Sequence, residues 1–183
     1  MVDVEFLCTD GSLICTDGVF LALGTTLLSL ITDRTQQDVD RVEELAEKGW
    51  AAMTEQERAE WLGEMKGAYN ASDMNRVGEA VAYVAGRLTD FGYSAPVSPK
   101  TDWTEDDEPS TDQLASYLAD ISTIRGALAV LPSTPATPAE IDGRTHQEAN
   151  DIEQILLDVD KLLNIMATTF IPCGEALCGE DNL

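Results

Sequence analysis

Residues 145–170 read THQEANDIEQILLDVDKLLNIMATTF, and apolar positions recur there at alternating intervals of three and four. This spacing is typical of the a and d positions of helices that pack at shallow angles. Thr145 and Glu148 form a capping-box pattern, which marks the start of a helix. The apolar stripe consists of Ala149, Ile152, Leu156, Val159, Leu163, Met166 and Phe170. The stretch therefore predicts one long helix of a bundle or a coiled coil.

Two segments further upstream repeat this spacing. Ser72 is a candidate cap for the first, whose stripe is Met74, Val77, Val81, Val84, Leu88 and Phe91. Ser110 or Thr111 opens the second, whose stripe is Leu114, Tyr117, Ile121, Ile124, Leu128 and Leu131. Short connections, marked by prolines at 132, 135 and 138, favour a bundle within one chain over a coiled coil between chains. A trimer of bundles would satisfy both patterns.

Two more helices are predicted before residue 72. The segment 33–53 has a stripe formed by Val39, Val42, Ala46, Gly49 or Trp50, and Met53. The capping-box pattern Thr54–Glu57 then opens a short helix that contains Trp61 and Leu62. Residues 32–171 are thus expected to form the helical part of the chain.

The first 23 residues have a different pattern, because Asp10-Gly11 and Asp17-Gly18 separate three short β-prone runs. Asp-Gly is typical of tight two-residue hairpin turns. The pattern predicts a three-stranded antiparallel meander of residues 2–9, 12–16 and 19–23, in which Cys15 pairs with Phe20. Such a ribbon is apolar on both faces and has to be covered, so we expect it to be an interface. Its expected contact residues are Phe6, Leu7, Cys8, Leu13, Ile14, Cys15, Phe20 and Leu21.

The expected fold class is mainly α. It comprises a heptad-patterned helical bundle, an N-terminal three-stranded β-meander and a short C-terminal tail with a Gly-Glu repeat. The expected parts are a docking segment of residues 1–31, a bundle of residues 32–171 and a tail of residues 172–183.

The charge balance narrows the range of partners. The 183 residues include 34 Asp and Glu against 11 Lys and Arg, which gives a net charge of −23. Such a surface repels nucleic-acid phosphates and anionic lipids, so no nucleic-acid or membrane partner is expected. The apolar stretch Val19–Ile31 has no basic residue before it and is too short to span a bilayer. The chain is therefore expected to be soluble and not secreted.

Residues suited to catalysis or metal binding are few. The single histidine, His146, has no nucleophile in a recognisable context, so a surface polar role is favoured over that of a general base. The four cysteines are Cys8, Cys15, Cys173 and Cys178, and only the last two have a zinc-knuckle spacing. Reduced thiols are therefore favoured over a zinc site.

The acidic segment 102–108 resembles a calcium loop only in part. It has Asp107 where an EF-hand needs glycine, and Gln113 where the final glutamate should be. A short turn at whose start Thr104 caps Asp107 is the favoured alternative. No enzymatic activity, metal or cofactor is expected.

Four phrases of the helical region resemble recurring phrases in small virion structural proteins of tailed phages and prophages of Gram-positive bacteria. They are TDRTQQDVDR (32–41), KGAYNASDMNRV (66–77), KTDWT (100–104) and ANDIEQIL (149–156). The resemblance covers roughly residues 32–180. It implies a non-enzymatic tail, baseplate or fibre-associated component, made in the bacterial cytoplasm and located in the virion. Its partners would be other virion proteins and further copies of itself, with a trimer favoured.

A second function class remains open. A net charge of −23 would steer the chain towards positively charged surfaces. The alternative is therefore an acidic soluble adaptor, chaperone or inhibitor of a basic protein partner.

Overall fold

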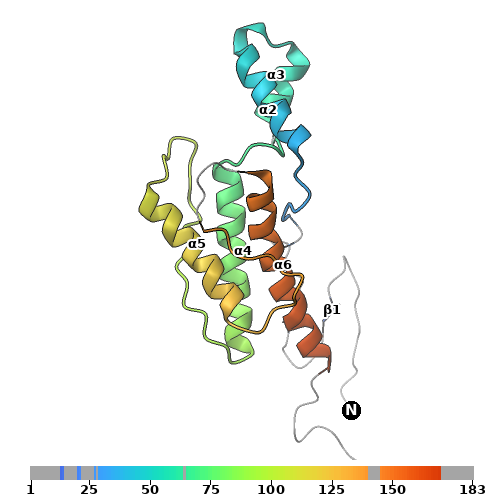
Figure 1. The fold of residues 1–183 in the computed structure, drawn as a ribbon, viewed down its shortest axis with the longest axis vertical. Coiled ribbons are helices and arrows are strands. Elements are labelled where there is room, and N and C mark those ends of the chain that lie inside the picture. Colours follow the sequence, from blue (N-terminus) through green and yellow to red (C-terminus); the bar gives the residue numbers. More distant parts are fainter. Residues whose placement is uncertain are drawn as a thin grey trace, which may run out of the picture.

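The structure is a computed structural model, and it describes residues 13–14, 20–21, 27, 29–63, 65–139 and 145–169. Its helices are α2 (Gln36–Lys48), α3 (Glu55–Leu62), α4 (Ala71–Asp90), α5 (Thr111–Gly126) and α6 (His146–Thr169). A short 3-10 helix, Trp50–Ala52, joins α2 to α3. Helices α4, α5 and α6 pack against one another as a three-helix bundle, and α2 and α3 form a helical hairpin beyond one end of it (Figure 1).

Side-chain caps explain where the helices begin. Thr54 caps α3 in a capping box with Glu57, and Thr145 accepts from the backbone N–H of Glu148 at the start of α6. Both predicted capping boxes are therefore confirmed. The predicted cap of α4 is wrong, because Asn70 rather than Ser72 accepts the backbone N–H groups of the first turn. The amide oxygen of Asn70 reaches donors two and three residues ahead, which places the cap two residues earlier.

The predicted stripes of α4, α5 and α6 supply most of a single hydrophobic core. Their buried members are Val77, Val81, Val84, Leu88, Ile121, Ile124, Ile152, Leu156, Val159 and Leu163. Leu118 and Ile155 are also buried, although neither belongs to a strict a/d stripe. The apolar face of a helix in a globular bundle is wider than a coiled-coil seam, so neighbouring positions join the core. Leu27, upstream of these helices, is only 3% exposed and packs into the same core.

The stripe predicted for residues 33–53 is confirmed only in part, because Met53 is buried and Val39 and Val42 are half-buried. Leu45 is fully buried, whereas Ala46 and Trp50 are exposed. Helix α2 lies beyond the three-helix core and packs against α3, so only a narrow face of it is covered. Exposed ion pairs also join the two helices, Arg41 to Glu60 and Lys48 to Glu57. When only a narrow face of a helix is covered, the heptad pattern predicts poorly which of its residues are buried.

The predicted fold class, a bundle with a three-stranded β-meander, is wrong for the described residues, which are mainly helical and contain no three-stranded sheet. The described residues of the N-terminal region include only β1 (Leu13–Ile14) and β2 (Phe20–Leu21), which pair antiparallel. Ile14 pairs with Phe20, one residue away from the predicted register, in which Cys15 would do so. The first predicted strand, residues 2–9, lies outside the described residues. An isolated two-stranded pair is marginal in water, and the Asp-Gly signal reports a local turn preference rather than a sheet.

An extended segment passes close to α4 after that helix ends. A Cβ atom added to Gly78 would lie 2.5 Å from the backbone oxygen of Lys100. In contrast, a Cβ added to Gly86, on the same helix, would have no neighbour within 4 Å. Gly78 is therefore needed for close packing, whereas Gly86 is not.

We expect Gly78→Ala and Gly86→Ala to change stability in opposite directions. Alanine at 78 overpacks the contact with Lys100, at a cost of about 1–3 kcal/mol in the free energy of unfolding. Alanine at 86 raises helix propensity without a clash and should stabilise the protein by up to about 1 kcal/mol. Urea unfolding followed by circular dichroism measures both effects. A stabilised Gly78→Ala variant would contradict the close approach.

Among the helices of the described residues, none combines the length and hydropathy that crossing a bilayer requires.

Candidate functional site

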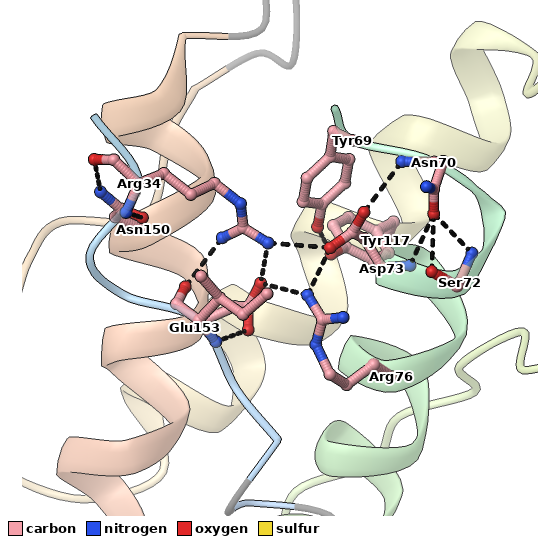
Figure 2. Close-up of polar contacts among 10 residues, drawn as sticks. Arg34, Tyr69, Asn70, Ser72, Asp73, Arg76, Tyr117, Asn150 and Glu153 are labelled. Atoms are coloured by element: carbon pink, nitrogen blue, oxygen red, sulfur yellow. Dashed lines mark hydrogen bonds and ion pairs between the residues drawn. The ribbon is translucent and has the colours of Figure 1, made fainter. Parts of the chain in front are cut away.

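Four charged side chains meet at the end of the bundle where the extended segment before α2 reaches α4 and α6 (Figure 2). Arg34 comes from that segment, Asp73 and Arg76 from the first turns of α4, and Glu153 from the third turn of α6. Arg34 is 4% exposed, Asp73 5% and Glu153 0%. We call these four residues the buried ion cluster.

Each arginine of the buried ion cluster contacts both carboxylates. Nη2 of Arg34 lies 2.8 Å from Oδ1 of Asp73 and 2.8 Å from Oε1 of Glu153. Nη2 of Arg76 donates to the same two oxygens, at 3.0 Å from Glu153. Two positive and two negative charges therefore balance within the cluster, which is the condition for burying them at moderate cost.

The backbone of the extended segment is bound to α6 at two residues. Asn150 accepts from the N–H of Arg34 at 3.0 Å and donates to its carbonyl oxygen at 2.9 Å. Glu153 accepts from the N–H of Ile31 at 2.5 Å, while the Arg34 guanidinium donates to the Ile31 carbonyl at 2.7 Å. Residues 31–34 are therefore held on α6 by both backbone and side chain.

Two tyrosines cover the cluster on the side of α5. The hydroxyl groups of Tyr69 and Tyr117 hydrogen-bond to each other, and the guanidinium of Arg34 lies 5.6 Å from the ring centre of Tyr69. Burial raises the pKa of the Tyr69 hydroxyl, an effect that its bond to Tyr117 only partly offsets. Burial likewise raises the pKa of Tyr117. Both hydroxyls therefore stay neutral at physiological pH.

The contacts of the cluster hold its members in place. Burial by itself would lower the pKa of Arg76, but its bonds and charge interactions with Glu153 and Asp73 outweigh burial and raise it. Both carboxylates also accept from backbone N–H groups, those of Asn70 and Ile31. Both guanidinium groups and both carboxylates are therefore engaged with one another or with the backbone. The physical effect of the cluster is to fix the segment before α2 to α4 and α6.

A second ion pair joins α4 to α6 further along the bundle. Arg87 bonds to Asp160 and, at 3.0 Å, to Asn164. Burial raises the pKa of Asp160 although Arg87 acts in the opposite direction. Glu153 and Asp160 thus place two acids on α6, each facing an arginine of the neighbouring segments.

The predicted interface residues are not brought into this site. Phe6, Leu7, Cys8 and Cys15 lie outside the described residues. Leu13, Ile14, Phe20 and Leu21 are described only as the backbone of β1 and β2. The predicted interface therefore stays a prediction. The cysteines at 173 and 178 also lie outside the described residues, so the question of thiols or zinc stays open.

The other residues considered from the sequence are placed as follows. His146 is the first residue of α6 and is half-buried. In the acidic segment the predicted short turn is confirmed, because the N–H of Asp107 donates to the Thr104 carbonyl at 3.1 Å. The side-chain cap is reversed, since the Asp107 carboxylate accepts from the N–H of Thr104 at 2.8 Å. Lys100 lies 2.7 Å from Asp102 and 3.6 Å from Asp107. Within the described ranges, no three His, Cys, Asp or Glu side chains are grouped so that they could hold a metal ion.

The sequence reasoning missed the buried ion cluster. One signal for it was present, because Glu153 and Asp160 stand one heptad apart beside core positions of the α6 stripe. In a chain with 34 acidic residues, that signal is weak. Moreover, Arg34 and Arg76, the partners of Glu153, come from segments far away in the sequence.

The described part of the chain is therefore mainly helical, and the segment just before α2 is fixed to the bundle by buried charged side chains. In comparisons with protein-family models, curated proteins and solved structures, nothing matches this chain.

Proposed function

We propose that this protein is a non-enzymatic structural component of a phage virion, associated with the tail, baseplate or fibre. It attaches to its neighbours through the apolar residues of its N-terminal 24 positions. The observation that supports this role is the anchoring of Leu27, Ile31 and Arg34 to the bundle. Leu27 lies in the core, and Ile31 and Arg34 are bonded to α6.

This anchoring has a mechanical consequence. If this segment were a flexible linker, the helical bundle would change its orientation freely relative to the attachment point. A segment held by buried hydrogen bonds and ion pairs instead transmits the orientation of its attachment point to the whole body. That property suits an assembly component. The assignment to a virion rests on the phrases that resemble phage structural proteins.

Incorporation into particles tests the proposal. Residues 1–24 are replaced by a Gly-Ser sequence of equal length, and purified particles are examined for this protein by mass spectrometry. We expect the protein to be absent from the particles, while the helical circular dichroism of the purified variant is unchanged. Leu27 is spared by the replacement, so the core remains complete.

The control is Glu43→Gln with Glu47→Gln, which neutralises two exposed acids of α2 and should enter particles normally. Two results would contradict the proposal. One is normal incorporation of the Gly-Ser variant. The other is loss of its helical signal, which would place residues 1–24 in the domain's own core.

The second candidate, an acidic adaptor for a basic protein, is favoured by the net charge of −23. The two functions differ in their dependence on salt. Attraction between exposed charges weakens steeply at high ionic strength, whereas a packed apolar contact persists. Salt titration of any interaction that the purified protein makes separates the two.

A further inference from the structure

An open groove of about 940 Å³ lies between α3, the start of α4, the segment 103–109 and the start of α5. Its apolar lining residues are Trp61, Leu62, Met74, Trp103, Pro109 and Leu114. We call it the α3–α5 groove. It is separate from the buried ion cluster, none of whose four residues lines it.

The α3 side of the groove is unusually apolar for an exposed surface. Leu62 is 76% exposed and Trp61 is 37% exposed. On the opposite side, Met74 and Trp103 are buried, at 6% and 7% exposed. Large exposed apolar side chains beside a concave surface are typical of a binding site.

Trp103 has an unmatched hydrogen-bond donor. Its indole N–H is buried and has no acceptor among the described residues. The backbone of Trp103 is held in place by the Asn75 side chain. Asn75 donates to the backbone carbonyl of Trp103 at 2.9 Å and accepts from its backbone N–H at 2.7 Å. Lys100 lies over the ring, with its Nζ 4.4 Å from the ring centre. Trp103 is thus a fixed, buried ring that forms part of the groove wall.

The rim of the groove carries negative charge. Glu105, Asp107 and Glu108 all line it. Asp107 is engaged by Thr104 and Lys100. Glu105 and Glu108 are exposed, and within the described part of the chain neither has an ion-pair or hydrogen-bond partner. The rim therefore attracts a cation, and the apolar wall attracts an apolar group.

We propose that the α3–α5 groove binds a segment of another protein in which an apolar side chain stands next to lysine or arginine. The apolar side chain covers Leu62 and Trp61, and the cation lies between Glu105 and Glu108. A second copy of this chain fits less well, because its 34 acidic residues outnumber its 11 basic ones.

The proposal goes beyond the attachment role proposed above, which concerns residues 1–24. The two can fail separately. A chain whose first 24 residues are replaced should still bind peptides in the groove, because none of the groove residues is changed.

The test uses the full chain and an array of synthetic heptapeptides that combine Leu, Phe or Trp with Lys or Arg. Matched peptides carry Glu in place of the basic residues. We expect binding only to the basic apolar peptides, and a fluorescent copy of the best one then gives the dissociation constant. Binding should also shift the NMR signal of the Trp103 indole N–H.

Two variants locate the interaction. Glu105→Gln with Glu108→Gln should weaken binding by about three- to tenfold at low salt, in line with two exposed charge pairs. Leu62→Ser should also weaken it by removing apolar contact, while both variants keep their helical circular dichroism. Glu43→Gln with Glu47→Gln on α2 removes the same charge away from the groove and should leave the affinity unchanged.

Three outcomes would overturn the proposal. The first is an array on which no basic apolar peptide binds. The second is equal weakening by the α2 control, which would indicate diffuse attraction to an acidic surface. The third is full binding by Leu62→Ser.

Discussion

Replacing Glu153 with alanine should lower the free energy of unfolding by about 3–5 kcal/mol, because it removes one partner from a buried ion cluster. Glu153 is fully buried and accepts from Arg34, Arg76 and the backbone of Ile31. Without it, two guanidinium groups share a single carboxylate in a site with little water. Against a total stability of about 5–15 kcal/mol for a typical domain, this is a large loss. Urea unfolding followed by circular dichroism gives the value.

Two further variants separate the charge effect from simple truncation. Glu79→Ala removes an exposed acid from α4 and should change stability by no more than about 0.5 kcal/mol. Arg34→Met combined with Glu153→Met replaces an opposite-charge pair with apolar groups. Its cost should be smaller than the sum of the single changes, since neither charge is left without its partner. If Glu153→Ala were as mild as Glu79→Ala, the cluster would contribute little to the fold.

The second large effect is expected for Leu27→Ala, at about 2–5 kcal/mol of lost stability. Leu27 is 3% exposed and belongs to the core formed by α4, α5 and α6. Truncation leaves a cavity that neighbouring side chains fill only in part. Thermal and urea unfolding of the purified variant measure the loss.

Leu62→Ala is the matched control for Leu27→Ala, because Leu62 is 76% exposed. We expect it to change stability by no more than about 0.5 kcal/mol. If Leu27→Ala behaved in the same way, the segment before Ile31 would not be anchored in the core. The support for an attachment role at the N-terminus would then be lost.

The sequence predicted the helices well where the signal was local and strong. The stripes of α4 and α6 and the capping boxes at Thr54 and Thr145 are confirmed. These signals depend on residues three or four positions apart, so they survive in any fold that covers the helix on one side. The α2 stripe was only partly right, since tertiary contacts, those with α3 among them, decide which of its residues are covered.

The N-terminal prediction went further than its signal allowed. Two Asp-Gly pairs indicate turns, but the number of paired strands and their register depend on what covers the ribbon. In the described residues, Ile14 pairs with Phe20 in a strand pair only two residues long on each side. The predicted ribbon has apolar residues on both faces. A shift of the register by one residue therefore exchanges one apolar face for the other, and the sequence pattern does not distinguish the two registers.

The sequence by itself determined where the chain forms helices, which faces of α4 and α6 are apolar, and that the surface is acidic. Only the tertiary structure decided which of the many acids are buried and paired. Arg34 is 39 residues from Asp73 and 119 residues from Glu153 along the chain, so no local pattern links them. Ion pairing depends on which helix faces meet, because a charge is stabilised in the interior only by an opposite charge within a few ångströms.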